Sequence, residues 1–344
     1  MLGGGLRQSI LLAPLAMHVD ELRMVLPSGD VIGKRPLDEF VRILRYYGIE
    51  MEFGQYCLHI MNRAEGDRKI VQRQRLNVAS TGVTFVAISA AVNIGFDAYE
   101  IDGASRDPEV KEVLDCIGAT FTYDAQSLII FSPVFNVNIT SVPLDRIAIA
   151  ELIIISQLHD VLSLTDFVRN EIEQRIGPDF IPVLKWLKGD GCPDQEIFLR
   201  AGQFPYLSTD ILPALCTALW LARKSFVVED MIFEWRMPKL YGALKSICPS
   251  GLKSAASGFS FTPYEGNATA GCQSVWRSDN IRQTSAGIIA LTYPCEMVGS
   301  VVESRLGILR AYTSEWFDAI ECITKTRLDL SSSTDICTIT RQSK

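Results

Sequence analysis

The sequence contains an internal repeat of about seventy residues, and this repeat limits the possible folds more than any other feature. A polar residue precedes an apolar segment typical of a helix at five positions: Arg7, Ser80, Asp145, Asp210 and Arg282. A second series, made of arginines, marks five further helix starts: Arg35, Arg106, Arg169, Arg236 and Arg310. Neighbours within each series lie 63 to 74 residues apart. The chain is therefore predicted to contain five related units.

Between these helices the sequence changes to β-branched and alternating residues, which are typical of strands. Such runs occur at 22–26, 98–101, 127–131, 135–139, 226–233 and 297–302. Gly48 and Gly118 follow helical segments and are predicted to end them. Alternating strands and helices predict α/β layers, with helices covering sheet faces. The polar, Pro-containing segment 138–143 indicates a junction between a domain of two units, 1–142, and a domain of three units, 143–344.

Composition excludes several classes of protein. The chain has 344 residues, of which 48% are hydrophobic and 21% charged, as expected for a globular protein of about two domains. Its net charge of −7 argues against a nucleic-acid partner. Nine cysteines without a C-x-x-C pair and three scattered histidines predict neither a metal site nor another cofactor. With no span long enough for a bilayer, we expect a cytoplasmic protein without a membrane partner, and its oligomeric state stays open.

The segment 26–38, L-P-S-G-D-V-I-G-K-R-P-L-D, resembles the active-site loop of UDP-N-acetylglucosamine enolpyruvyl transferases, L-P-G-G-C-x-I-G-x-R-P-V-D. Other segments resemble motifs of this family in the family's order: 6–10, 79–84, 104–109, 143–147, 208–210 and 233–236. The resemblance covers nearly the whole chain. It implies two domains facing a cleft, each an inside-out α/β barrel with helices inside and sheets outside. Because the family has six units, the first domain is expected to be incomplete and to lack a substrate-binding lysine and asparagine.

The resemblance also implies an activity, the transfer of enolpyruvate from phosphoenolpyruvate to the 3-hydroxyl of UDP-N-acetylglucosamine, the first committed step of peptidoglycan synthesis. In this reaction an alcohol adds to C2 of phosphoenolpyruvate while C3 is protonated, and phosphate is then eliminated. Guanidinium groups match both the carboxylate and the phosphate of phosphoenolpyruvate. The candidates are Arg7, Arg35, Arg282 and Arg310, each of which could instead be a surface or helix-end arginine.

Two carboxylates are the catalytic candidates. Asp210 follows Ser208 and Thr209 at a predicted helix start and would accept the hydroxyl proton, although an ordinary N-cap is the alternative. Asp30 stands where most members of the family carry a cysteine, and a carboxylic acid with a raised pKa can protonate C3. Its alternative is a surface turn.

The nucleotide candidates also come from the resemblance. Arg35, Pro36, Leu37 and Asp38 would border the uracil, Ser80, Thr81 and Gly82 would hold the diphosphate at a helix start, and the backbone of Ile232 would hold the sugar's amide.

The chain departs from the family pattern at Trp235, in place of a small amide, and at Ala148, in place of an acid. Two other functions therefore stay open. One is an enolpyruvyl transferase acting on another nucleotide acceptor, and the other is a non-catalytic relative that binds a nucleotide or a protein partner.

Overall fold

The computed structural model describes residues 13–19, 21–25, 37–54, 57–62, 73–94, 98–131, 145–162, 165–189, 196–202, 204–233, 235–263, 275–278, 280–293, 301–305, 314–333 and 336–341. They fall into two compact units, one made of the described residues up to 131 and the other of those from 145 onward. Each unit has its own hydrophobic core. The predicted junction at 138–143 and the predicted strand at 135–139 lie outside the described residues.

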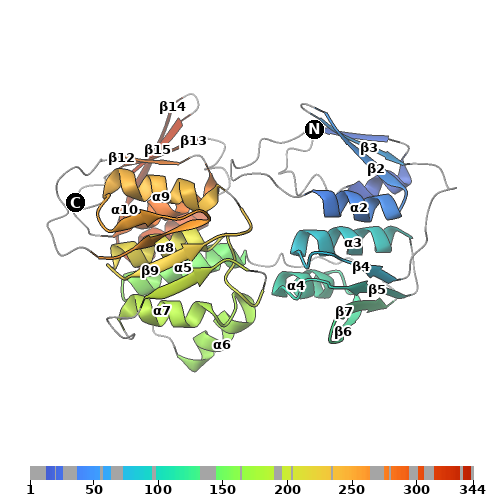
Figure 1. Ribbon diagram of the computed structural model, residues 1–344, viewed down its shortest axis with the longest axis horizontal. Helices are drawn as coiled ribbons and strands as arrows, with labels where there is room; N and C mark the ends of the chain where they lie inside the picture. The colour runs from blue at the N-terminus through green and yellow to red at the C-terminus, as the bar shows by residue number, and fades with distance from the viewer. Residues whose placement is uncertain are drawn as a thin grey trace. The chain divides into compact units, whose positions relative to one another are not determined.

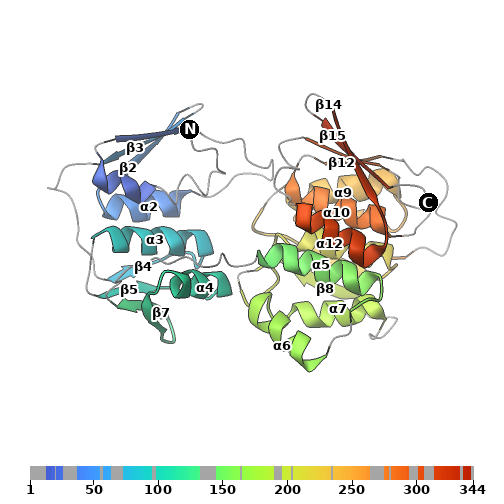
Figure 2. The same cartoon turned by 180° about the vertical axis from the view of Figure 1, so that it is seen from behind.

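The first unit holds its helices between two sheets (Figures 1 and 2). Its elements are η1 (Ala13–His18), β1 (Glu21–Val25), α2 (Asp38–Tyr46), β2 (Ile49–Phe53), β3 (Cys57–Asn62), β4 (Arg73–Arg75), α3 (Thr81–Ile94), β5 (Ala98–Asp102), α4 (Pro108–Cys116), β6 (Thr120–Tyr123) and β7 (Ser127–Phe131). The strand orders are β1-β3-β2 and β4-β5-β7-β6. Glycines follow the C-caps of α2 and α4. Gly48 has a φ of 73° and Gly118 a φ of 69°, which confirms that these glycines end helices.

The second unit contains more helix. Its elements are α5 (Arg146–Leu158), α6 (Asp166–Arg175), α7 (Phe180–Lys188), β8 (Ile197–Arg200), α8 (Leu212–Leu221), β9 (Phe226–Glu229), α9 (Arg236–Ile247), β10 (Leu252–Ser254), β11 (Gly258–Phe261), β12 (Val275–Ser278), α10 (Ile281–Thr292), β13 (Val301–Arg305), α12 (Ser314–Thr324), β14 (Leu328–Ser333) and β15 (Ile336–Arg341). The strand orders are β10-β11-β9-β8 and β12-β13-β15-β14.

The three four-stranded sheets have the same topology. In each, two parallel strands are joined through a helix, and an antiparallel pair follows them in the chain. The sheet β4-β5-β7-β6 thus repeats as β8-β9-β11-β10 and as β12-β13-β15-β14, while β1-β3-β2 matches its last three strands. The predicted repeat of strand and helix is confirmed in these sheets, and the fold is α/β.

The third unit of the repeat departs from this pattern. Residues 145–189 form α5, α6 and α7, and their described positions include no strand. Arg169 lies inside α6 rather than before it, because Thr165 is the N-cap and its hydroxyl accepts a hydrogen bond of 3.4 Å from the Val168 N–H. Two helices therefore follow α5 where a strand was expected.

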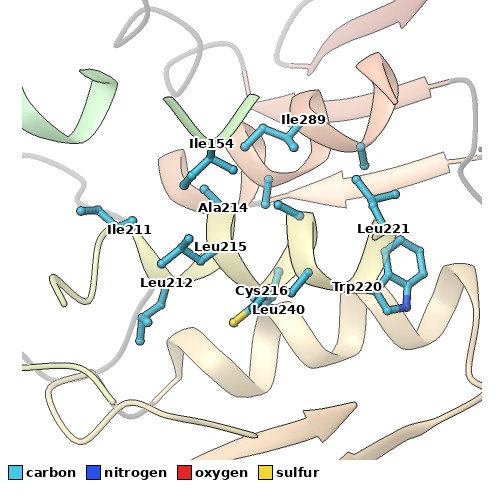
Figure 3. Close-up of a cluster of buried hydrophobic side chains, with 14 of the residues drawn as sticks. Ile154, Ile211, Leu212, Ala214, Leu215, Cys216, Trp220, Leu221, Leu240 and Ile289 are labelled. Atoms are coloured by element: carbon cyan, nitrogen blue, oxygen red, sulfur yellow. The ribbon is translucent and has the colours of Figure 1, made fainter. Parts of the chain in front are cut away.

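Helices such as α8 occupy the interior, and the sheets lie outside them. In β8, Leu199 is fully buried while Phe198, on the opposite face of the strand, is 57% exposed. At the centre of the second unit every residue of α8 is buried, and α8 contacts α5, α9 and α10 (Figure 3). A helix that is apolar on all sides belongs in the core of a protein. No helix in the described part of the chain is long and apolar enough to cross a bilayer.

Candidate functional site

Asp210 lies in the turn that leads into α8, where it faces an arginine from the next helix. The N-cap residue of α8 is Ile211, so Asp210 precedes the cap position. Its Oδ1 is 2.6 Å from Nη1 of Arg236, the first residue of α9. Only 4% of the Arg236 side chain is exposed, whereas Asp210 retains 26%. The carboxylate is therefore held by a buried guanidinium and still open to solvent in part.

Arg236 is fixed by further polar contacts. Its Nη1 donates a 2.8 Å hydrogen bond to Thr209 Oγ1, and the Thr209 hydroxyl donates to Asp230. Asp230 Oδ1 accepts hydrogen bonds from the backbone N–H groups of Ile232 at 2.9 Å and Phe233 at 3.2 Å. The guanidinium carbon also lies 4.4 Å from the centre of the Phe233 ring, within the range of a cation–π contact. These contacts orient Arg236 toward Asp210.

Arg282 approaches Asp210 from α10. It is the second residue of this helix, whose N-cap Asn280 accepts a 2.9 Å hydrogen bond from the Gln283 N–H. Its Nη2 lies 4.0 Å from Asp210 Oδ2, so each oxygen of Asp210 faces a different arginine. Its Nη1 lies 3.6 Å from Oε1 of Glu151. Asp210 and Arg282, both predicted from the motifs, are therefore neighbours in the structure.

Glu151 is a buried acid on the core face of α5, among Ile147, Ile154 and Ile155. Burial raises the pKa of Glu151 to about 7, against the opposing effects of the Arg282 charge and a hydrogen bond with Ser285. At neutral pH the side chain is thus ionised in only part of the molecules.

This cluster is suited to an anionic ligand and to proton transfer. Arg236 begins α9, and Arg282 lies in the first turn of α10, where the helix N-termini add partial positive charge. Two guanidinium groups can bind phosphate or carboxylate, and a partly exposed carboxylate between them can accept a proton. We therefore define the acid–arginine cluster as Asp210, Arg236, Arg282 and Glu151.

The candidate nucleotide residues that the structure describes in the first unit also lie together. Thr81 begins α3, and its hydroxyl donates a 3.1 Å hydrogen bond to Asp107. A Cβ at Gly82 would lie 3.3 Å from Cζ of Phe40, in the first turn of α2. The starts of α2 and α3 are therefore adjacent, which brings the pair Leu37 and Asp38 near the segment 80–82.

Of the remaining predicted site residues, the structure describes Ile232 but not the other five. Ile232 is 40% exposed, and its backbone N–H donates a hydrogen bond to Asp230. The candidates that lie outside the described residues are Arg7, Asp30, Arg35, Pro36 and Arg310. Among the described residues, no group of three or more His, Cys, Asp or Glu side chains is placed to hold a metal ion.

The sequence alone assigned no role in a site to Arg236 and Glu151, which belong to the acid–arginine cluster, or to Thr209 and Asp230, which hold Arg236 in place. Arg236 was present as a helix marker in the second series, and its role as a partner of Asp210 emerges from the fold. Glu151 carried a local signal, since it lies four residues after Ile147 and three before Ile154 and so shares their helix face. An acid at a core position of an isoleucine-rich helix indicates a buried polar contact.

Comparison with known proteins relates the chain to one class of enzyme. No protein-family model matches it. The UDP-N-acetylglucosamine 1-carboxyvinyltransferase of Prochlorococcus marinus is 26% identical over 247 residues, which are 68% of this chain and 54% of that protein. The enzyme of the same name from Sphingopyxis alaskensis is 33% identical over 115 residues, 33% of this chain and 26% of that protein. The chain spans about half the length of the longer matches among these curated relatives.

A solved structure shares the fold. The enolpyruvyl transferase NikO from Streptomyces tendae superposes with a TM-score of 0.58 and 12% identity, over 97% of this chain and 78% of that one. The resemblance predicted from the motifs is therefore confirmed, in sequence by the carboxyvinyltransferases and in fold by an enolpyruvyl transferase.

Proposed function

We propose, from the similarity to UDP-N-acetylglucosamine 1-carboxyvinyltransferases, that this protein transfers the enolpyruvyl group of phosphoenolpyruvate to the 3-hydroxyl of UDP-N-acetylglucosamine. The observation that carries the proposal is Asp210, held between the guanidinium groups of Arg236 and Arg282 at 2.6 and 4.0 Å. Phosphoenolpyruvate and UDP-N-acetylglucosamine are then its substrates, and peptidoglycan synthesis is its pathway.

In the proposed reaction Asp210 is the base. The hydroxyl oxygen of the acceptor bonds to C2 of phosphoenolpyruvate as Asp210 takes the hydroxyl proton, and Asp30 delivers a proton to C3. The resulting tetrahedral ketal then loses a C3 proton back to Asp30. The C2=C3 bond forms again, the C2–O bond to phosphate breaks, and phosphate leaves with the proton that Asp210 holds. No oxidant, reductant or metal enters this balance.

The arginines serve the anionic groups in this scheme. Arg282 is 19% exposed and meets the phosphate or carboxylate of phosphoenolpyruvate, together with Arg7, Arg35 and Arg310 from the motifs. Arg236, almost completely buried, orients Asp210. The nucleotide lies against Arg35, Pro36, Leu37 and Asp38, its diphosphate against 80–82, and the sugar's amide against the backbone of Ile232.

The test is replacement of Asp210 by asparagine. This change keeps the shape of the side chain and removes the base, so kcat is expected to fall about 10²- to 10⁴-fold. The measurement is release of inorganic phosphate from phosphoenolpyruvate that depends on UDP-N-acetylglucosamine. A suitable control is Asp179→Asn, because Asp179 is exposed at the start of α7 and makes no side-chain cap. Equal rates in Asp210→Asn and wild type would refute the role of Asp210.

A second candidate function is enolpyruvyl transfer to another nucleotide. The observation that favours it is Trp235, which is 45% exposed directly before Arg236 and is much larger than the small amide of the resembled motif. The same phosphate assay with a panel of nucleotides and nucleotide sugars distinguishes the two candidates. The acceptor with the highest kcat/KM identifies the substrate.

A further inference from the structure

Glu151 lies on the buried side of Arg282, and the proposed reaction does not use it. Its side chain is 1% exposed, and its Oε1 lies 3.6 Å from Arg282 Nη1. Among the described residues this oxygen accepts no hydrogen bond. An acid so placed is costly to bury without a partner, and Arg282 is the cation that faces it.

The surroundings of Glu151 narrow its possible roles. The charged groups with the largest effects on its pKa are Arg282 on α10, Asp145 at the start of its own helix, and Asp210 before α8. The helices α7 and α12 also pack against α5, and they bring apolar residues such as Leu184 and Ile320 to the shared core. Through its contact with Arg282, Glu151 therefore links the apolar core to the rest of the acid–arginine cluster.

We propose that Glu151 is a positioning residue for Arg282, and that its protonation sets how strongly Arg282 binds the anionic substrate. The inference rests on the proposed function, in which Arg282 meets phosphoenolpyruvate.

The physical reason is the charge of the cluster. With Glu151 ionised, the carboxylates of Asp210 and Glu151 balance the guanidinium groups of Arg236 and Arg282, and the four charges sum to zero. With Glu151 protonated, the cluster carries one net positive charge and attracts an anion more strongly. Because coupling between two sites is reciprocal, a bound anion in turn favours the protonated form of Glu151.

The pH range of this change follows from the burial of Glu151, which raises its pKa to about 7. The affinity for phosphoenolpyruvate should consequently fall as pH increases from 6 to 8.5. A bound anion carries the same charge as ionised Glu151 and so disfavours its ionisation. A coupling of about one pKa unit corresponds to a change of about tenfold in anion affinity.

The experiment compares wild type with Glu151→Gln. Glutamine keeps the length of the side chain and an oxygen toward Arg282, but it cannot ionise. We measure the KM for phosphoenolpyruvate of both proteins and take the ratio of wild type to Glu151→Gln. This ratio should rise about tenfold between pH 6 and 8.5, while the corresponding ratio of kcat values stays unchanged. The ratio removes the titration of the substrate's own phosphate. A matched control is Glu173→Gln, an exposed glutamate on α6, for which the ratio should stay constant.

Binding without turnover separates this inference from the proposed function. Calorimetry with phosphoenolpyruvate, and with inorganic phosphate as a second probe, measures the same pH dependence in the absence of any acceptor. If UDP-N-acetylglucosamine supports no reaction but the affinities of wild type and Glu151→Gln still diverge with pH, the proposed function fails and the role of Glu151 stands. Parallel pH profiles in the two proteins, or no binding of either probe at any pH, would overturn the inference.

Discussion

Polar and charged side chains in the second unit form a connected series. It runs from Asp230, through Thr209 and Arg236, to Asp210 and Arg282, and ends at Glu151. At one end Asp230 is satisfied by hydrogen bonds from the backbone N–H groups of Ile232 and Phe233. At the other end Glu151 lies among isoleucines, where its charge is disfavoured. The net charge of the series therefore depends on whether Glu151 is protonated.

This burial has a consequence for stability. The pKa of Glu151 rises from 4.5 in the unfolded chain to about 7 in the fold, so the native state binds more protons than the unfolded state between these values. Stability from this group is present below pH 4.5 and is lost as pH increases through 7. A shift of this size corresponds to about 3 kcal/mol. The free energy of unfolding of Glu151→Gln, minus that of wild type, should therefore increase by up to about this amount as pH rises from 4.5 to 8.

Urea unfolding at pH 5 and pH 8 measures the effect. All five tryptophans, at 186, 220, 235, 276 and 316, belong to the second unit, so their fluorescence reports the unit that contains Glu151. Equal midpoint differences between the two proteins at both pH values would contradict an elevated pKa.

At the scale of elements, the predicted helix starts at Ser80 and Asp145 are confirmed, because Ser80 directly precedes α3 and Asp145 is the N-cap of α5. The start predicted at Arg169 was wrong, because α6 begins four residues earlier at the cap Thr165. The strand at 127–131 was predicted with the bounds that β7 has. The run 226–233 was predicted too long, since Asp230 captures the N–H groups of Ile232 and Phe233 and ends β9 at Glu229. Neither α6 and α7 in the third unit nor the pairing of Glu151 with Arg282 could be predicted, because both depend on contacts distant in sequence.

Two glycines of the second unit, one in a sheet and one in a helix, provide a matched pair of substitutions. A Cβ at Gly258, at the start of β11, would lie 1.7 Å from the Val228 carbonyl oxygen of β9. Gly258→Ala should therefore disturb the pairing of β9 and β11 and cost about 3 kcal/mol. At Gly242, inside α9, a Cβ would meet nothing within 4 Å, so Gly242→Ala should stabilise by about 0.5–1 kcal/mol.

Tryptophan fluorescence during urea unfolding measures both substitutions in the same unit. If the urea midpoint of Gly258→Ala is equal to or higher than that of wild type, the added Cβ does not destabilise the pairing of β9 and β11. We expect the urea midpoint to fall for Gly258→Ala and to rise for Gly242→Ala.

At the scale of the whole molecule, two separate cores support two sets of candidate residues. The first unit holds Leu37, Asp38 and the segment 80–82, and the second holds Asp210, Arg282 and Ile232.

The proposed nucleotide sugar should stabilise the protein. A ligand that binds only the native state adds about 2.7 kcal/mol at a hundredfold excess over its Kd, which corresponds to a rise of several degrees in Tm. UDP-N-acetylglucosamine should give this rise with wild type and with Arg175→Ala, a half-exposed arginine on α6, but not with Arg35→Ala. An unchanged rise in Arg35→Ala would place the nucleotide elsewhere.

The complete burial of α8 has a consequence for how the chain is made. Its neighbour α10 ends at Thr292, which is 71 residues beyond Leu221, the last residue of α8. At a synthesis rate of about 5–20 residues per second, roughly 4–14 s pass before α10 is complete. During this interval the nascent chain presents an apolar helix without one of its main partners. The second unit therefore depends on its own early neighbours, α5 and then α9, or on a chaperone to shield α8 while the ribosome finishes the fold.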